Sequence, residues 1–196
     1  MPKEEPATNL DSCNTLPITS SFRLDPTKTY HLVVLQLSPT VQSPIPSILN
    51  KLTDHPLQIF TGKTDCLSEL KCSEQATVFI DTTDIAPNER NDLLDNISEL
   101  DTVHFIYIQS GPSEKDNDDD DERNQFFRRY PKIKAMFDNE QRLMVQWAID
   151  TANECRKAGD VYIELEDKDR GRQCFEEGIK LYKHLSVFLN DKRRVR

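Results

Sequence analysis

Long apolar runs are absent from this chain of 196 residues. A membrane helix needs about 18 or more consecutive apolar residues, and no stretch approaches that length. The first residues are polar and broken by prolines, unlike a secretory signal. The net charge of −9 argues against a general nucleic-acid binder, because phosphate backbones favour basic surfaces. We therefore expect a cytoplasmic protein with no membrane and no nucleic-acid partner.

Cysteines and histidines with ligand spacing are also lacking. The chain has 5 cysteines, an odd number at irregular spacing, which does not match the disulfide framework of a secreted domain. Cys66 and Cys72 are too far apart for a CxxC zinc half-site, and no second half-site follows. The 4 histidines lie in unrelated segments. We therefore expect no metal and no other cofactor.

Negative charge is concentrated in one segment. Residues 114–122 hold seven carboxylates and a single lysine, a local charge of −6 that leaves −3 for the rest of the chain. Carboxylates at this density cannot pack together, so we expect a solvated acidic loop. Prolines and polar residues fill residues 1–29, which predicts a disordered or extended arm. Residues 190–196 form a basic tail.

Short apolar runs alternate with amphipathic segments through residues 30–138, as expected for strands and covering helices. The runs that predict strands lie at residues 30–37, 57–60, 77–80, 103–108 and 132–137. The segments that predict helices lie at residues 44–52, 87–99 and 124–130, while residues 65–74 fit either a short helix or an irregular crossover. Lysines mark the last strand as an edge strand. This order predicts an α/β fold, with a small, mostly parallel sheet of four or five strands flanked by helices.

The alternation is similar to the flavodoxin-like layout of receiver domains. In those domains an aspartate that ends the third strand accepts phosphate, and Asp81 has that position here. Receiver domains also carry an acidic pair after the first strand to hold Mg²⁺, whereas residues 37–40 of this chain are Leu-Ser-Pro-Thr. The resemblance therefore implies the fold and not the phosphoacceptor chemistry.

Residues 139–189 predict two helices joined by a tight bend. Apolar or small residues recur in steps of three and four, on one face of each arm. The predicted stripes are Met144, Ala148, Ala152, Cys155, Gly159 and Tyr162 on the first arm, then Gly171, Phe175, Gly178, Tyr182, Leu185 and Leu189 on the second. Two such stripes can bury each other only as an antiparallel hairpin.

The large and small residues of this hairpin follow an order that resembles one tetratricopeptide repeat, over about 34 residues. The matching positions are Cys155, Ala158, Gly159, Tyr162, Gly171, Phe175 and Gly178. Three positions depart from the family: Cys155 replaces its tryptophan, Glu166 its turn glycine and Lys183 its closing proline. The resemblance implies a surface for a protein or peptide, and a hairpin that only caps the sheet is the alternative. A stable array needs about three repeats, so one repeat cannot stand alone.

A second resemblance covers residues 130–137 and the helix with Met144, Trp147 and Ala148. It is similar to N-terminal modules of multidomain proteins that continue into tetratricopeptide arrays or mono-ADP-ribosyltransferase domains. The resemblance implies an interaction module, because no transferase residues can be placed in this chain.

Together these features predict a non-enzymatic protein-interaction or scaffolding module with no catalytic residue. They do not predict its oligomeric state. The expected anchors on the hairpin are the aromatic residues Trp147, Tyr162, Phe175, Tyr182 and Phe188. The alternative is a degenerate or uncharacterised α/β enzyme, or a regulatory module of an ADP-ribosyltransferase-type protein. Its ligand would bind where the parallel strands end, at a rim formed by Ser38, Thr61, Lys63, Asp81, Gln109 and Ser110.

Overall fold

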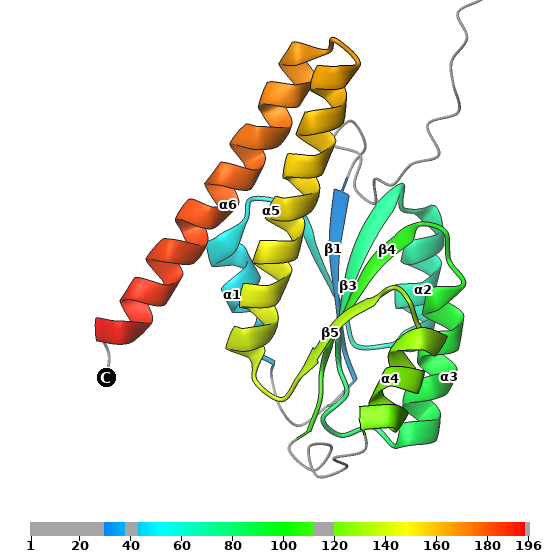
Figure 1. Ribbon diagram of the computed structural model, residues 1–196. Coiled ribbons are helices and arrows are strands. Elements are labelled where there is room, and N and C mark those ends of the chain that lie inside the picture. The colour runs from blue at the N-terminus through cyan, green and yellow to red at the C-terminus, as the bar shows by residue number, and fades with distance from the viewer. Residues whose placement is uncertain (1–29, 38–42, 112–119, 195–196) are drawn as a thin grey trace, which may run out of the picture.

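A five-stranded parallel sheet forms the centre of the computed structural model, and helices cover both of its faces (Figure 1). The structure describes residues 30–37, 43–111 and 120–194. The strands are β1 (Tyr30–Gln36), β2 (Leu57–Phe60), β3 (Gln75–Asp81), β4 (Val103–Gln109) and β5 (Ile133–Phe137), in the order β2-β1-β3-β4-β5. The helices are α1 (Ile45–Leu52), α2 (Lys63–Cys72), α3 (Pro87–Ser98), α4 (Asp120–Arg129), α5 (Glu140–Glu164) and α6 (Lys168–Arg194). The predicted α/β class is confirmed.

The central strands are largely apolar because their alternating side chains enter two cores, one on each face of the sheet. In β1, Leu32 and Val34 pack on one side of the sheet, while Val33 and Leu35 pack on the other. Every residue of β3 is buried. The two edge strands are β2 and β5, and the predicted edge position of the lysine-bearing strand β5 is therefore confirmed.

Helices α1, α5 and α6 cover one face of the sheet (Figure 1). The core on this face joins Trp147 of α5 to Phe79 of β3, whose ring centroids are 5.8 Å apart in an edge-on arrangement. The hydroxyl of Tyr107 in β4 donates a hydrogen bond of 2.9 Å to Asp150 of α5. Residues 139–189 therefore share one core with the sheet along part of their length, and the free end of the hairpin projects beyond it.

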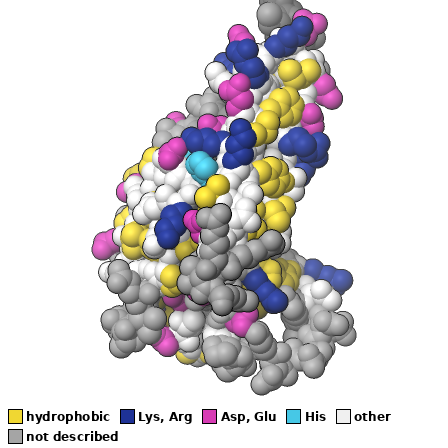
Figure 2. All heavy atoms as spheres, turned by 90° about the vertical axis from the view of Figure 1, so that its left-hand side faces the viewer, with side chains coloured by type: hydrophobic (Ala, Val, Ile, Leu, Met, Phe, Trp, Pro, Cys, Tyr) yellow, Lys and Arg dark blue, Asp and Glu magenta, His cyan; other side chains and the backbone are white. Residues whose placement is uncertain are grey.

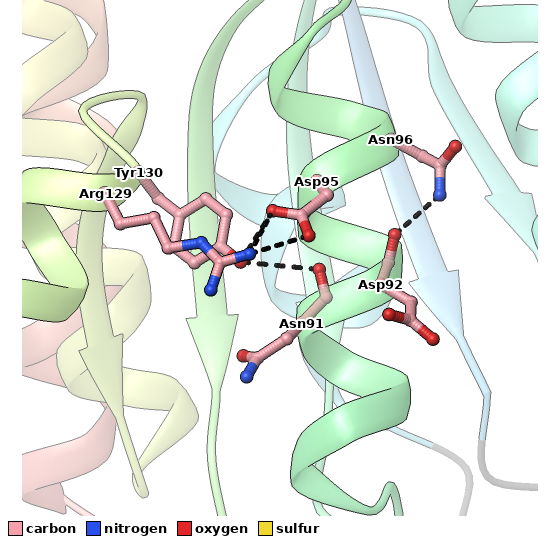
Figure 3. Close-up of polar contacts among 6 residues, drawn as sticks. All are labelled: Asn91, Asp92, Asp95, Asn96, Arg129 and Tyr130. Atoms are coloured by element: carbon pink, nitrogen blue, oxygen red, sulfur yellow. Dashed lines mark hydrogen bonds and ion pairs between the residues drawn. The ribbon is translucent and has the colours of Figure 1, made fainter.

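Helices α2, α3 and α4 cover the opposite face. Figure 3 shows how the end of α4 is fastened to α3. The Arg129 guanidinium donates to both carboxylate oxygens of Asp95, at 3.0 and 2.8 Å, and the hydroxyl of Tyr130 donates to the same carboxylate at 2.8 Å. The Tyr130 side chain is buried, and this burial together with Asp95 raises its pKa.

The structure decides one alternative that the sequence left open and corrects two expectations about element boundaries. Residues 65–74 are largely helical, within α2. The acidic segment is not a loop over its whole length, because α4 begins at Asp120. The end expected to be a basic tail is helical as far as Arg194. The arm predicted for residues 1–29 and most of the acidic segment lie outside the described residues.

The hairpin bend is a tight turn whose geometry would suit a glycine. Glu166 has φ of 63°, in the left-handed region, immediately after α5 ends. The amide of Glu166 donates to the carbonyl of Ile163 at 3.0 Å, and that of Asp167 donates to Tyr162 at 2.8 Å. This pair of bonds is the Schellman pattern, in which the left-handed position usually carries glycine.

Close approach of α5 and α6 explains the glycines of the hairpin. A Cβ atom added to Gly159 would lie 2.6 Å from the Phe175 ring, and one added to Gly171 would lie 3.1 Å from the carbonyl oxygen of Gly159. At Gly178 the nearest atom would be the Ala152 carbonyl oxygen, at 3.3 Å. The predicted close contact between the two helices is therefore confirmed.

Candidate functional site

The carboxyl ends of the strands form the first candidate site. Asp81 is buried and accepts hydrogen bonds from the amide and the hydroxyl of Thr83, at 3.1 and 2.7 Å. Gln109 and Ser110 are also buried, and the Gln109 side chain accepts a long hydrogen bond of 3.4 Å from Ser43. The structure thus brings Asp81, Gln109 and Ser110 to the same end of the sheet.

The remaining rim residues are more exposed or lie outside the described residues. Thr61 is exposed, and Lys63 forms an ion pair of 3.4 Å with Glu89 of α3. Ser38 lies outside the described residues. Asp81 is hydrogen-bonded within its own turn and Lys63 is paired with Glu89, so among the described rim residues neither forms an acid–base pair with another.

The five expected anchors of the hairpin fall into three groups. Trp147 has no exposed surface and Phe188 is 6% exposed, so both belong to the core and the expectation that they form a docking surface needs correction. Tyr162 and Phe175 are half-buried. Tyr182 is 45% exposed and is the one expected anchor that projects fully to the surface.

An exposed apolar column runs along α6. We define the α6 column as Ile179, Tyr182 and Leu189, which are 52%, 45% and 37% exposed. Steps of three and seven residues place these side chains on one flank of a 3.6-residue helix. Figure 2 shows hydrophobic side chains in a broken column along the hairpin, with charged side chains on either side. The free end of the hairpin adds the exposed Ile163 and Leu165.

A pocket lies on the opposite flank of α6, between the α1–β2 connection and the hairpin. We call it the α1–α6 pocket; its volume is about 210 Å³. Its lining consists of Leu52, Thr53, Asp54, His55, Trp147, Thr151, Cys155, Glu177, Lys180, Leu181 and His184. A second hollow of about 320 Å³ shares His184 and continues along α6 to Asp191.

Two polar links hold the α1–β2 connection against α6 at the mouth of this pocket. Lys180 and Asp54 form an ion pair of 2.7 Å, which lowers the pKa of Asp54 and raises that of Lys180. Nδ1 of His184 lies 2.9 Å from the carbonyl oxygen of Leu52, so this nitrogen must donate a proton to the carbonyl. The positive charge of Lys180 is therefore already neutralised.

The inner wall of the pocket contains several uncharged polar groups. The indole nitrogen of Trp147 and the hydroxyl of Thr151 are buried and form no hydrogen bond of standard geometry in the described part of the chain. Both lie near enough to the hydroxyl of Tyr30 to act on its pKa. The ring of Tyr30 packs edge-on against that of His55, with centroids 5.3 Å apart. Burial lowers the pKa of His55 and raises that of Tyr30 to about 12. His55 is therefore neutral at physiological pH.

Cys155 is the nucleophilic side chain in the pocket lining, and its surroundings disfavour the thiolate. Burial raises its pKa to about 12, and the negative potential of Cys174, Glu177 and Glu154 adds to the shift. A thiol attacks efficiently only as the thiolate, so Cys155 is not activated at neutral pH. The arrangement can bind and orient a small group, and it holds no activated nucleophile among these residues.

Metal binding finds no support in the described ranges, where no three His, Cys, Asp or Glu side chains lie close enough to hold an ion. Within the same ranges, no helix has the length and apolar character needed to cross a membrane.

Reasoning from sequence missed the α1–α6 pocket. Its lining comes from three separated segments, and only a known packing arrangement brings them together. The one local signal was a set of polar residues at steps of three and four on α6, namely Glu177, Lys180 and His184. Comparison with protein-family models, curated proteins and solved structures gives no significant match to this chain.

Proposed function

We propose that this chain is a non-enzymatic binding module, in which the sheet supports the hairpin and the α6 column receives an amphipathic helix of another protein. The observation that carries the proposal is the column itself. Its three apolar side chains are each more than a third exposed, although both faces of the sheet are covered. The hairpin buries other apolar residues in the core that it shares with the sheet, and Ile163, Leu165 and Val187 are exposed elsewhere on it.

A helix fits this surface better than an extended peptide. The column spans residues 179–189, about 15 Å along the axis at about 1.5 Å per residue. A partner helix with apolar residues at steps of three, four and seven would place a side chain beside each member. The resemblance of the hairpin to a tetratricopeptide repeat, a family that binds helices and peptides, agrees with this role.

Charged residues beside the column would set the orientation of the partner. The exposed side chains of Arg172, Glu176 and Lys183 lie on α6 next to the column. Rim charges of this kind contribute more to association rate and register than to affinity. We expect moderate affinity, because three apolar side chains form a small interface.

A display library of amphipathic helical peptides tests the proposal and requires no identified partner. The full chain should enrich peptides whose apolar residues recur at steps of three and four. Peptides with alternating apolar residues, or enrichment no greater than that given by an unrelated protein, would refute it.

A further inference from the structure

The α1–α6 pocket has an uncompensated negative charge at its mouth. Asp54 and Lys180 neutralise each other through their ion pair. Glu177 has no hydrogen bond or ion pair within 4 Å among the described residues, although its potential acts on His55, Cys155 and Lys180. These three residues belong to the α1–β2 connection, α5 and α6, the three segments that line the pocket, so Glu177 acts on a residue of each segment.

Several other polar groups of the pocket can accept hydrogen bonds, while the indole N–H of Trp147 can only donate. His184 donates through Nδ1 to the Leu52 carbonyl, so Nε2 is an acceptor whenever the ring is uncharged. The Thr151 hydroxyl forms no hydrogen bond of standard geometry among the described residues, and it lies near the hydroxyl of Tyr30. The strongest donor, Lys180, is held by Asp54 at 2.7 Å. An anion would meet the carboxylate of Glu177 and could use the indole N–H of Trp147 as a donor, whereas a cation rich in N–H groups would find several acceptors and an opposite charge.

The volume of the pocket sets the size of the group that it can hold. A cavity of about 150 Å³ accommodates benzene, with six non-hydrogen atoms. On that scale, the volume of about 210 Å³ corresponds to about eight non-hydrogen atoms. Part of the pocket wall is apolar and could contact a short aliphatic chain; it consists of Leu52, Leu181 and the Trp147 ring.

We propose that the α1–α6 pocket binds a side-chain-sized organic cation, a guanidinium or primary ammonium group on an aliphatic stem, with Glu177 as its counter-ion. The site goes beyond the docking function, because the pocket and the α6 column lie on opposite flanks of α6. Either site can therefore fail its test without affecting the other. The cation could belong to a small molecule or to a basic side chain of a peptide.

Titration of the full, ¹⁵N-labelled chain at pH 8 tests the site by NMR. The probes are the N-acetyl methylamides of arginine, lysine and citrulline; citrulline has nearly the shape of arginine without its charge. We expect the arginine and lysine probes to shift amide signals of residues 52–55 and 177–184. The citrulline probe should bind about tenfold more weakly, since a charge-assisted hydrogen bond is lost. Equal binding of all three probes, or no shift with any of them, would overturn the proposal.

Substitution of the counter-ion provides the matched control. Glu177→Gln should weaken binding of the arginine probe about tenfold, whereas Glu176→Gln at the adjacent position should leave its affinity unchanged. Both glutamates are exposed, so neither change should affect folding, which circular dichroism can verify. Equal effects of the two substitutions would show that the attraction is general and that the pocket is not the site. Arginine within a pentapeptide, compared with the free arginine probe, distinguishes a peptide anchor from a small-molecule ligand.

Discussion

The contact between Gly159 and Phe175 gives a quantitative test of the hairpin. In Gly159→Ala, the new Cβ would lie 2.6 Å from one ring atom and 2.8 and 2.9 Å from two others. Overpacking of this kind costs about 1–3 kcal/mol, while replacing a helical glycine by alanine contributes about 1 kcal/mol of stability. We expect a net loss of about 1 kcal/mol in the free energy of unfolding.

The sign of the effect should reverse when the ring is removed. In a Phe175→Ala background no ring opposes the methyl group, so Gly159→Ala should stabilise the protein by about 0.5–1 kcal/mol. The coupling between the two substitutions is then about 2 kcal/mol. Urea unfolding of the four proteins, followed by far-UV circular dichroism, measures the four free energies that this coupling requires. If Gly159→Ala has the same effect with and without the ring, the close packing of Phe175 on Gly159 is wrong.

Three further predictions concern the turn, the α3–α4 contact and the buried ionisable groups. Glu166→Gly should raise the free energy of unfolding by about 0.5–1 kcal/mol, because φ of 63° suits glycine; a thermal melt showing a loss would contradict it. Tyr130→Phe should cost about 1–2 kcal/mol in urea unfolding, because it removes a buried donor from Asp95, whereas Asn96→Ala on the exposed side of α3 should be near neutral. Burial raises the pKa of Cys155 from 9.0 to about 12, so its contribution to stability is complete below pH 9 and is lost as the pH rises towards 12. The free energy of unfolding, measured between pH 8 and pH 10, should therefore fall above pH 9. The part due to this thiol is up to about 1.4 kcal/mol per pH unit, and Cys155→Ser should make the decrease less steep.

The strands and their covering helices could be predicted because burial on both faces leaves a strong local pattern. Residues 30–36 and 103–109 are apolar at most positions. Such a short, nearly continuous apolar run is typical of a strand in a parallel sheet that is covered on both faces. Ile45, Ile48, Leu49 and Leu52 repeat at helical spacing and are all buried.

Two of the six positions predicted for the apolar face of the second hairpin arm are wrong by one residue. Tyr182 and Leu189 were expected in the stripe, but they are exposed, and the neighbouring Leu181 and Phe188 are buried instead. Adjacent residues on a helix differ by about 100° in direction, so two apolar neighbours give nearly equal periodic patterns. The sheet decides between them, because Leu181 and Phe188 belong to the core that it shares with α1 and α5.

The candidate sites were harder to predict from the sequence than the strands and helices, because they depend on tertiary packing. The α1–α6 pocket joins residues 52–55 to residues 147–155 and 177–184, and no local pattern links segments so far apart. The burial of Trp147 follows from its contact with Phe79, on a strand about 70 residues earlier in the chain. Of the expected anchors, Tyr182 keeps the exposure that docking requires, and Ile179 was not foreseen.

The affinity of a selected amphipathic helix for three versions of the chain tests the central claim most directly. Tyr182→Glu places a charge in the α6 column, whereas Val187→Glu places the same charge at another exposed position, on the opposite flank of α6. Isothermal titration calorimetry should show binding weakened by about tenfold or more in Tyr182→Glu and unchanged in Val187→Glu. Equal affinities for the natural chain and Tyr182→Glu would contradict the proposed role of the hairpin.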